Sequence, residues 1–191
     1  MEVMVFIDGT WLWHSTMSLD DKLDLYKLPR KIVSVLSKKW DRELVLKDVI
    51  LTSSIPVNVQ PCDMFGINKR ENFFKVLEEK CGYKVEIYNI NFRGRSLNRS
   101  LRHPNDTWEP KEKCVDIAVA SNLIYYAALN EYDVAVLITG DKDFLPALSK
   151  VTALNKKAVI ASFRKSCSHR LIDNYPGLIF IDDLIDDIRM V

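Results

Sequence analysis

Three aspartates stand directly after stretches that are apolar at almost every position. Asp8 follows the run VMVFI of residues 3–7, and Asp141 and Asp143 follow the run VAVLITG of residues 134–140. Runs of this length that do not alternate are typical of strands buried on both faces of a parallel sheet. Ligands of such sheets bind at the carboxyl ends of the strands. If the two runs are neighbouring strands, three carboxylates converge at one edge, which is the geometry needed to hold a divalent metal ion.

Strand and helix patterns alternate along the 191 residues, which favours a parallel α/β fold. After the first strand, we expect further strands near residues 49–51, 85–88, 133–140, 158–161 and 178–181. Helices are expected near residues 29–40, 68–80, 113–129 and 144–154, around Leu171, and from Asp183 onward. The chain is long enough for one well-buried domain and short for two. We therefore predict a single domain over residues 1–191, a three-layer sandwich with a central, mostly parallel sheet.

The bulk composition is that of an ordinary water-soluble chain. A net charge of +1 gives no global attraction to nucleic acid or to an anionic membrane. The four cysteines are widely spaced and include no C-x-x-C pair, which argues against a zinc site. The first strand begins directly after Met1, which leaves no room for a targeting segment, and no apolar stretch reaches the ~18 residues that span a bilayer. We therefore expect a soluble, cytoplasmic protein with no membrane partner.

A fourth aspartate extends the group at the strand ends. Asp116 lies one turn into the predicted helix of residues 113–129, which is apolar on nearly every face and should be buried. Because the residues that follow it are nearly all apolar, we expect Asp116 to face the interior or a cleft. A buried carboxylate without a partner is costly, and a metal ion or Lys113 would offset that cost. Carboxylate-bound Mg²⁺ or Mn²⁺ activates water and neutralises phosphate charge, as phosphodiester hydrolysis requires.

Each of these aspartates also has an ordinary structural interpretation. Asp141 or Asp143 could cap the helix that follows. Asp8 could belong to a strand-end turn, and Asp116 could complement the dipole of its helix. Four separate structural roles at four sheet-edge positions are less expected than one shared site.

At these residues the chain resembles the LabA-like type of NYN domain, a branch of the PIN-like ribonuclease superfamily. The matching segments are FIDG at residues 6–9, EKCVDIAVA at 112–120 and ITGDKDF at 138–144, and weaker similarity continues to about Ile181. The resemblance implies a PIN-like, Rossmann-like parallel-sheet fold and metal-dependent cleavage of RNA, with Mg²⁺ or Mn²⁺ as cofactor. It assigns catalysis and metal binding to four residues, Asp8, Asp116, Asp141 and Asp143, and places Thr139 in the lining of the site. Lys113, as the possible partner of Asp116, is also expected to line it.

Two positions depart from the family pattern, and both would line the site. Where the family usually has Asn, three residues after its first Asp, this chain has Trp11, which cannot orient a phosphate or a bound water as an amide would. Where the family commonly has another Asp, this chain has Asn122, which removes a charge. Trp11 could instead stack on a nucleobase, although Trp more often packs in a core. A catalytically weak or inactive module that binds RNA or a protein partner in a regulatory role therefore remains the alternative.

The irregular stretch of residues 91–111 interleaves basic and aromatic side chains, a composition that suits single-stranded RNA. The residues expected to contact RNA are Arg93, Arg95, Arg99 and Arg102, with Lys142 approaching a phosphate from between the paired aspartates. The alternative is a solvated loop whose charges have no ligand. Single-stranded RNA is thus the expected partner, and the chain could also form a homodimer.

Two other enzyme classes are disfavoured. A haloacid dehalogenase-type phosphatase needs a second aspartate two residues after its nucleophile, and that position is Thr10. A dinucleotide-binding enzyme needs a G-x-G-x-x-G turn after the first strand, and the sequence there is D-G-T-W.

Overall fold

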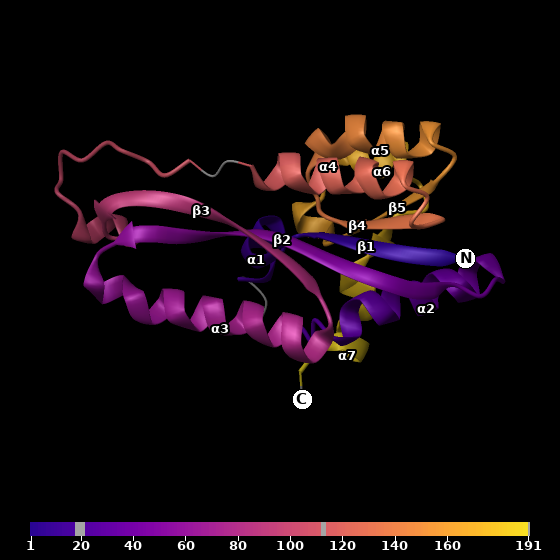
Figure 1. The fold of residues 1–191 in the computed structure, drawn as a ribbon, viewed down its shortest axis with the longest axis horizontal. Helices are drawn as coiled ribbons and strands as arrows, with labels where there is room; N and C mark the ends of the chain where they lie inside the picture. Colours follow the sequence, from indigo (N-terminus) through magenta and orange to yellow (C-terminus); the bar gives the residue numbers. More distant parts are fainter. Residues whose placement is uncertain (18–21, 112–113, 191) are drawn as a thin grey trace.

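The computed structural model describes residues 1–17, 22–111 and 114–190 (Figure 1). The described residues form a six-stranded sheet in the order β3-β2-β1-β4-β5-β6, and every strand pairing is parallel. The strands are β1 (Glu2–Asp8), β2 (Val45–Val59), β3 (Lys84–Arg95), β4 (Val134–Ile138), β5 (Lys157–Ser162) and β6 (Ile179–Phe180). The helices are α1 (Gly9–Thr16), α2 (Lys27–Trp40), α3 (Met64–Cys81), α4 (Val115–Ala128), α5 (Leu145–Ala153), α6 (His169–Asn174) and α7 (Ile185–Ile188). The predicted α/β fold with a parallel central sheet is confirmed.

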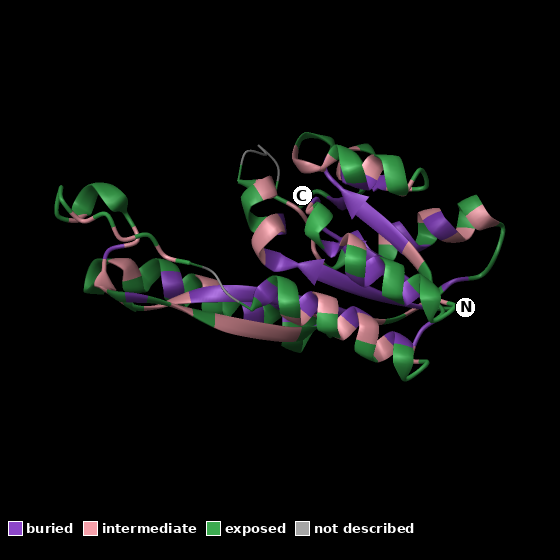
Figure 2. Cartoon of the chain, turned by 90° about the horizontal axis from the view of Figure 1, so that it is seen from above, coloured by how far each residue is buried: buried purple, intermediate pink, exposed green. Residues whose placement is uncertain are grey.

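Helices cover both faces of this sheet and so complete the three layers. On one face Val3, Val5 and Ile7 of β1 pack with residues of α1, α2, α3 and α7. On the other face Met4 and Phe6 pack with residues of α4, α5 and α6. None of these β1 side chains is more than 1% exposed, and Figure 2 shows the central strands buried. The run is apolar at every position because both of its faces are covered.

The two apolar runs are neighbouring strands, which is the condition for their aspartates to meet at one edge. Ile7 of β1 pairs with Ile138 of β4, while Asp8 pairs with Thr52 of β2 on the other side. The chain runs outward from β1 through β2 and β3 and then returns to β4, so the strand order reverses between β1 and β4. Ligands of open parallel sheets bind at such a switch point, beyond the carboxyl ends of the strands.

β2 and β3 are much longer than the sequence predicts. β1 ends at Asp8, opposite Thr52, but β2 continues to Val59 with β3 as its partner. At a rise of ~3.3 Å per residue, the extension reaches about 23 Å past the level of Asp8. With α3 and the loop after β3 it forms a projection that we call the arm (residues 53–111), at the left of Figures 1 and 2. Pro56 is tolerated within β2 because β1 has already ended there, which leaves one edge unpaired.

Two helix predictions need correction. The stretch after β1, where no helix was expected before residue 29, contains α1, which begins at Gly9 directly after the strand. The helix expected over residues 113–129 is not buried on nearly every face. α4 buries one stripe that includes Val115, Val119 and Leu123, whereas Ile117 is 72% exposed. The composition of α4 was misleading because apolar residues also occupy its outer surface.

Candidate functional site

Asp8 is held rigidly where β1 turns into α1. Its Oδ1 accepts a hydrogen bond from the backbone N–H of Trp11 at 3.0 Å, which caps the helix, and its Oδ2 accepts one from the Thr139 hydroxyl at 3.1 Å. The residue is only 3% exposed. Glycine is required next, because a Cβ at Gly9 would lie 2.9 Å from the carbonyl oxygen of Thr52. A buried, fully oriented carboxylate therefore marks the end of the central strand.

Thr139 joins Asp8 to the aspartates that follow β4. Its fully buried hydroxyl also accepts a hydrogen bond from the backbone N–H of Asp141 at 3.2 Å. The Asp141 Oδ1 accepts in turn from the backbone N–H of Asp143 at 2.9 Å and caps a short 3-10 helix, Lys142–Phe144. Asp141 thus caps a helix, as the structural interpretation proposed, and also lies at the same sheet edge as Asp8. We call this group (Asp8, Thr139, Asp141) the acidic edge.

The other two predicted carboxylates are on the surface. The Asp143 side chain is 76% exposed, with its Oδ1 4.0 Å from Lys142 Nζ. Asp116 is exposed in the first turn of α4, so the expectation that it faces the interior is wrong. The reason is the position of the buried stripe, which begins at Val115 and leaves Asp116 to the side, where it complements the helix dipole. Lys113, predicted as its partner, lies outside the described residues.

The chemistry of these donors fits a hard divalent cation, because Mg²⁺ and Mn²⁺ prefer carboxylate and hydroxyl oxygens. Their arrangement does not yet enclose one. Within residues 1–17, 22–111 and 114–190, no three side chains among histidine, cysteine, aspartate and glutamate are grouped as a metal site requires. The oxygen donors are therefore of the chemical type that binds Mg²⁺ or Mn²⁺, and two of them, Asp8 and Asp141, are connected through Thr139.

Trp11 is half-buried and packs against the core. Its ring stacks on that of Phe163 with centroids 6.0 Å apart, and its Nε1 donates a hydrogen bond to the carbonyl oxygen of Ser166 at 3.2 Å. The same turn requires Gly140, since a Cβ there would lie 2.0 Å from that carbonyl oxygen. These contacts favour a packing role for Trp11 over stacking on a nucleobase.

Sequence reasoning missed one carboxylate close to the acidic edge. Glu86 of β3 accepts a hydrogen bond on Oε2 from Asn122 of α4 at 2.8 Å and another on the same oxygen from the Thr52 hydroxyl at 3.4 Å. In the register of the sheet Thr52 pairs with Asp8 on one side and with Glu86 on the other. The alternating sequence VEIY at residues 85–88 is typical of a half-exposed strand, in which a glutamate normally faces solvent. Nothing in the spacing of Glu86 indicates its partner on α4.

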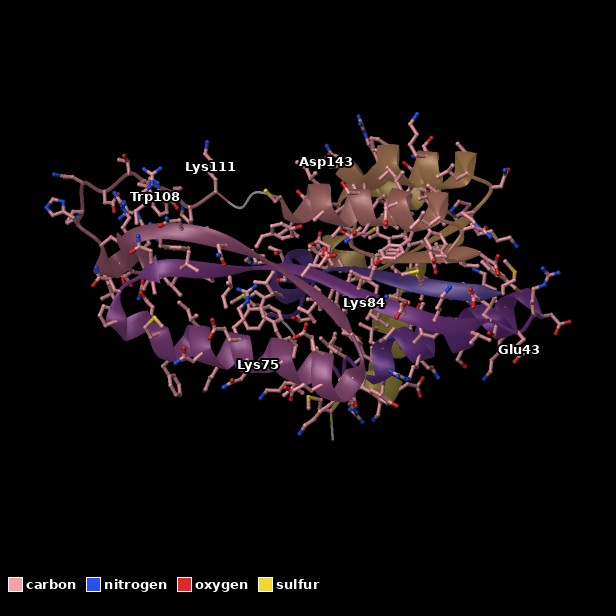
Figure 3. All side chains as sticks on the ribbon, viewed as in Figure 1. Glu43, Lys75, Lys84, Trp108, Lys111 and Asp143 are labelled. Atoms are coloured by element: carbon pink, nitrogen blue, oxygen red, sulfur yellow. The ribbon has the colours of Figure 1, made fainter. Side chains whose placement is uncertain are left out.

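The basic loop of the arm is a folded structure built around Trp108. The ring of Trp108 packs edge-on against Phe92 at 5.8 Å, and the guanidinium carbons of Arg95, Arg93 and Arg102 lie 4.9, 5.8 and 5.7 Å from its centroid. Figure 3 labels Trp108 in this loop, which lies on the same side of the sheet as α4. The loop is therefore folded around Trp108, and whether its charges contact RNA or only solvent stays a prediction.

Hydrogen bonds hold several of the predicted RNA-contacting arginines in place. Arg95 pairs with Asp106 at 2.7 Å, and Arg102 donates to the carbonyl oxygens of Ser96 and Trp108. The hydrogen bond from the backbone N–H of Trp108 is the main cause that lowers the pKa of Asp106, and Arg95 lowers this pKa further. Arg99 donates to the carbonyl oxygen of Asp106 but remains exposed, as does Arg93. Arg95 and Arg102 thus maintain the loop, while Arg93 and Arg99 present charge at its surface.

A cavity of about 550 Å³ lies on the opposite face of the sheet, between α1 and α3. Trp13, Phe73 and Phe74 contribute to its apolar lining, and Arg70 lies over the Trp13 ring at 5.3 Å. The acidic edge faces the α4 side instead, since Met4 and Phe6, which share a face with Asp8, pack there. The cavity is therefore separate from the carboxylates.

Comparisons with known proteins agree on the fold. The family model of the NYN domain, a branch of the PIN-like superfamily, matches residues 2–182. A crystal structure of a Vibrio parahaemolyticus protein of unknown function superposes with a TM-score of 0.60, covering 99% of this chain and 96% of that one. Sequence identity to it is 16%, so this likeness concerns the fold alone. No curated protein matches the sequence significantly. Among the described residues, the helices are all too short or too polar to cross a membrane.

Proposed function

Because the chain belongs to the NYN domain family, whose members have the fold of PIN-like nucleases, we propose that it is a ribonuclease acting on single-stranded or unpaired RNA. The observation that supports this most strongly is the link from Asp8 through Thr139 to Asp141 at the switch point of the sheet. Catalytic groups of open parallel sheets gather at that position. Burial of Asp8 and its hydrogen bonds fix the carboxylate before substrate arrives, as a preorganised site requires.

The proposed cofactor is Mg²⁺ or Mn²⁺, for which Asp8, Asp116, Asp141 and Asp143 are the candidate ligands. A divalent ion would supply the activation of water and the neutralisation of charge that hydrolysis of a phosphodiester needs. The protein contributes a fixed carboxylate at Asp8, an oriented one at Asp141, and exposed carboxylates at Asp116 and Asp143. The exposed pair would meet the ion and the substrate from the solvent side.

The arm is the proposed path for the RNA strand. Residues 93–111 contain five basic side chains and two acidic ones, although the whole chain has a net charge of only +1. This local excess attracts a polyanion, as the bulk charge does not. Arg93 and Arg99 are exposed for contact with phosphates, and Lys142 offers a third cation beside the acidic edge. Arg95 and Arg102 would act indirectly by maintaining the loop.

The test is cleavage of a labelled single-stranded RNA with Mn²⁺ or Mg²⁺ present. Asn caps helices as well as Asp does, so Asp141→Asn keeps the hydrogen bond to the Asp143 N–H and removes the charge. We expect a loss of rate of about 100-fold or more, within the usual range for removing a group that acts directly. Asp186→Asn, a change to an exposed acid on α7, is the matched control and should cleave normally. Cleavage that survives Asp141→Asn would refute the assignment.

Two observations favour the second candidate, a module that binds RNA without cutting it. Trp11 is occupied by packing, and Asn122 provides an amide where a charge would favour a metal. This alternative predicts that wild-type protein retains labelled RNA in a filter-binding assay while leaving it uncut at every Mn²⁺ concentration. The two functions therefore separate in a single experiment that measures binding and cleavage together.

A further inference from the structure

The side chain of Glu86 lies on the same face of the sheet as that of Asp8, the face covered by α4. The β1 and β2 side chains Phe6 and Ile50 pack in the α4-side cluster, and alternation along each strand places Asp8 and Thr52 on that face as well. Glu86 reaches the hydroxyl of Thr52 and the amide of Asn122 on α4, so it lies on this face too. Adjacent strands are ~4.8 Å apart, which sets the Cα atoms of Glu86 and Asp8 about 10 Å from one another.

The bond to Asn122 fixes the distribution of charge. A carboxylate only accepts hydrogen bonds, so the amide must present Nδ2 to Glu86 and turn its oxygen away. The pair therefore has a single negative charge, located on β3, and an amide of defined orientation on α4. Both hydrogen-bond donors to Glu86, Thr52 and Asn122, are neutral, and no lysine or arginine of the described residues forms a salt bridge with it. Holding a half-buried carboxylate in this way costs free energy, so a role other than stability is expected.

We propose that Glu86 is a positioning residue of the acidic edge, which supplies the negative charge on its β3 side and orients the Asn122 amide. The proposal rests on the proposed function, because it assigns Glu86 to the same site. A unit negative charge about 10 Å from a divalent cation, at a dielectric constant between those of a protein surface and of bulk water, changes cation binding by roughly tenfold. Glu86 would thus raise the affinity of the acidic edge for a divalent cation without being a direct ligand.

The geometry allows this charge to be moved by one hydrogen-bond length. In Glu86→Gln the amide keeps a similar size and still accepts from Asn122, but the charge is lost. In the double variant Glu86→Gln/Asn122→Asp the charge returns on α4, and the new carboxylate accepts from Gln in a reversed pair. In Asn122→Asp alone, two carboxylates would face each other across 2.8 Å. Like charges at that distance destabilise the fold.

The experiment measures Mn²⁺ affinity of the RNA-free protein by electron paramagnetic resonance, together with RNA cleavage and melting temperature. Glu86→Gln should lower Mn²⁺ affinity and cleavage about tenfold without lowering the melting temperature, and the double variant should restore affinity and cleavage. Asn122→Asp alone should melt lower than the double variant. Glu131→Gln, which removes an exposed carboxylate at the opposite end of the sheet, is the control and should bind Mn²⁺ normally.

Three outcomes decide the question. If Glu86→Gln binds Mn²⁺ as wild type does, the inference is overturned even if RNA is cleaved. If the double variant is folded but remains defective, charge supply by Glu86 is also refuted. If wild type binds Mn²⁺ without cleaving RNA and the affinities still follow the predicted pattern, the role of Glu86 stands and the ribonuclease function fails.

Discussion

Removing the Thr139 hydroxyl should test whether the acidic edge is a connected unit. Thr139→Val keeps the shape of the side chain but deletes the donor to Asp8 and the acceptor for the Asp141 N–H. A hydrogen bond to a charged group contributes about 1.5–3 kcal/mol and one between neutral groups about 1 kcal/mol. Because the residue is fully buried, water cannot replace either bond. We expect the free energy of unfolding to fall by about 3 kcal/mol, which lowers the melting temperature of a domain of this size by about 6–12 °C.

Thr139→Ser is the matched control, since it keeps the hydroxyl and loses a buried methyl group, at a cost of about 1 kcal/mol. Urea denaturation followed by circular dichroism gives both free energies, and the RNA assay is run well below both melting temperatures. We expect Thr139→Ser to retain most of the cleavage activity and Thr139→Val to lose it, because the valine no longer fixes the Asp8 carboxylate. Equal stability of the two variants would show that the hydroxyl does not hold the edge together.

Three further predictions follow from other parts of the molecule. Gly140→Ala should lower the free energy of unfolding, measured by urea denaturation, by about 3 kcal/mol because its Cβ would meet the backbone carbonyl of Ser166. Gly66→Ala in α3 is the control. Its Cβ would meet nothing within 4 Å, so it should be neutral or slightly stabilising. The pKa of Asp106 is lowered, so the carboxylate stabilises the loop fully at pH values above the ordinary pKa of 3.8. This stabilisation is lost as the pH falls through the lowered pKa. The indole N–H resonance of Trp108 should therefore stay in its folded position at pH 4 and move only at lower pH, and in Asp106→Asn it should already be shifted at pH 7. Reversing charge at the tip of the arm with Arg93→Glu/Arg99→Glu should weaken binding of long RNA severalfold and leave binding of a dinucleotide unchanged; a uniform loss at every length would contradict the arm as an RNA path.

The centre of the molecule could be predicted from the sequence because one physical constraint acts there without exception. Strands covered on both faces must be apolar at every position. Residues 3–7 and 134–138 can therefore be recognised as such strands from the sequence, and the end of each apolar run marks the end of its strand. The pairing of these strands then brings Asp8 and Asp141 to one edge, as predicted. The sequence was sufficient to predict these strands because positions buried on both faces accept only apolar side chains.

The arm could not be predicted because its strands are covered by α3 on one face only. Beyond Thr52 the β2 sequence is SSIPVNV, and two serines before Pro56 ordinarily indicate the end of a strand. Proline is accepted only because β1 has already stopped opposite Thr52, four residues earlier, and where β1 stops is a fact about a distant segment. Asp116 was misplaced for a related reason, since the buried stripe of α4 depends on which side of the helix meets the sheet.

Glu86 illustrates the general form of this limit. Spacing along the chain tells which residues share a strand face, and strand ends tell which residues reach an edge. Neither tells that Glu86 on β3 and Asn122 on α4 will lie 2.8 Å apart, since that contact depends on the register of β3 against β2 and on the placement of α4 above them. An amide at position 122 therefore looks like a lost charge when the helix is considered alone. In the folded chain the charge lies one hydrogen bond away on another element, so the acidity of this site is a property of the pair and has to be judged from both members.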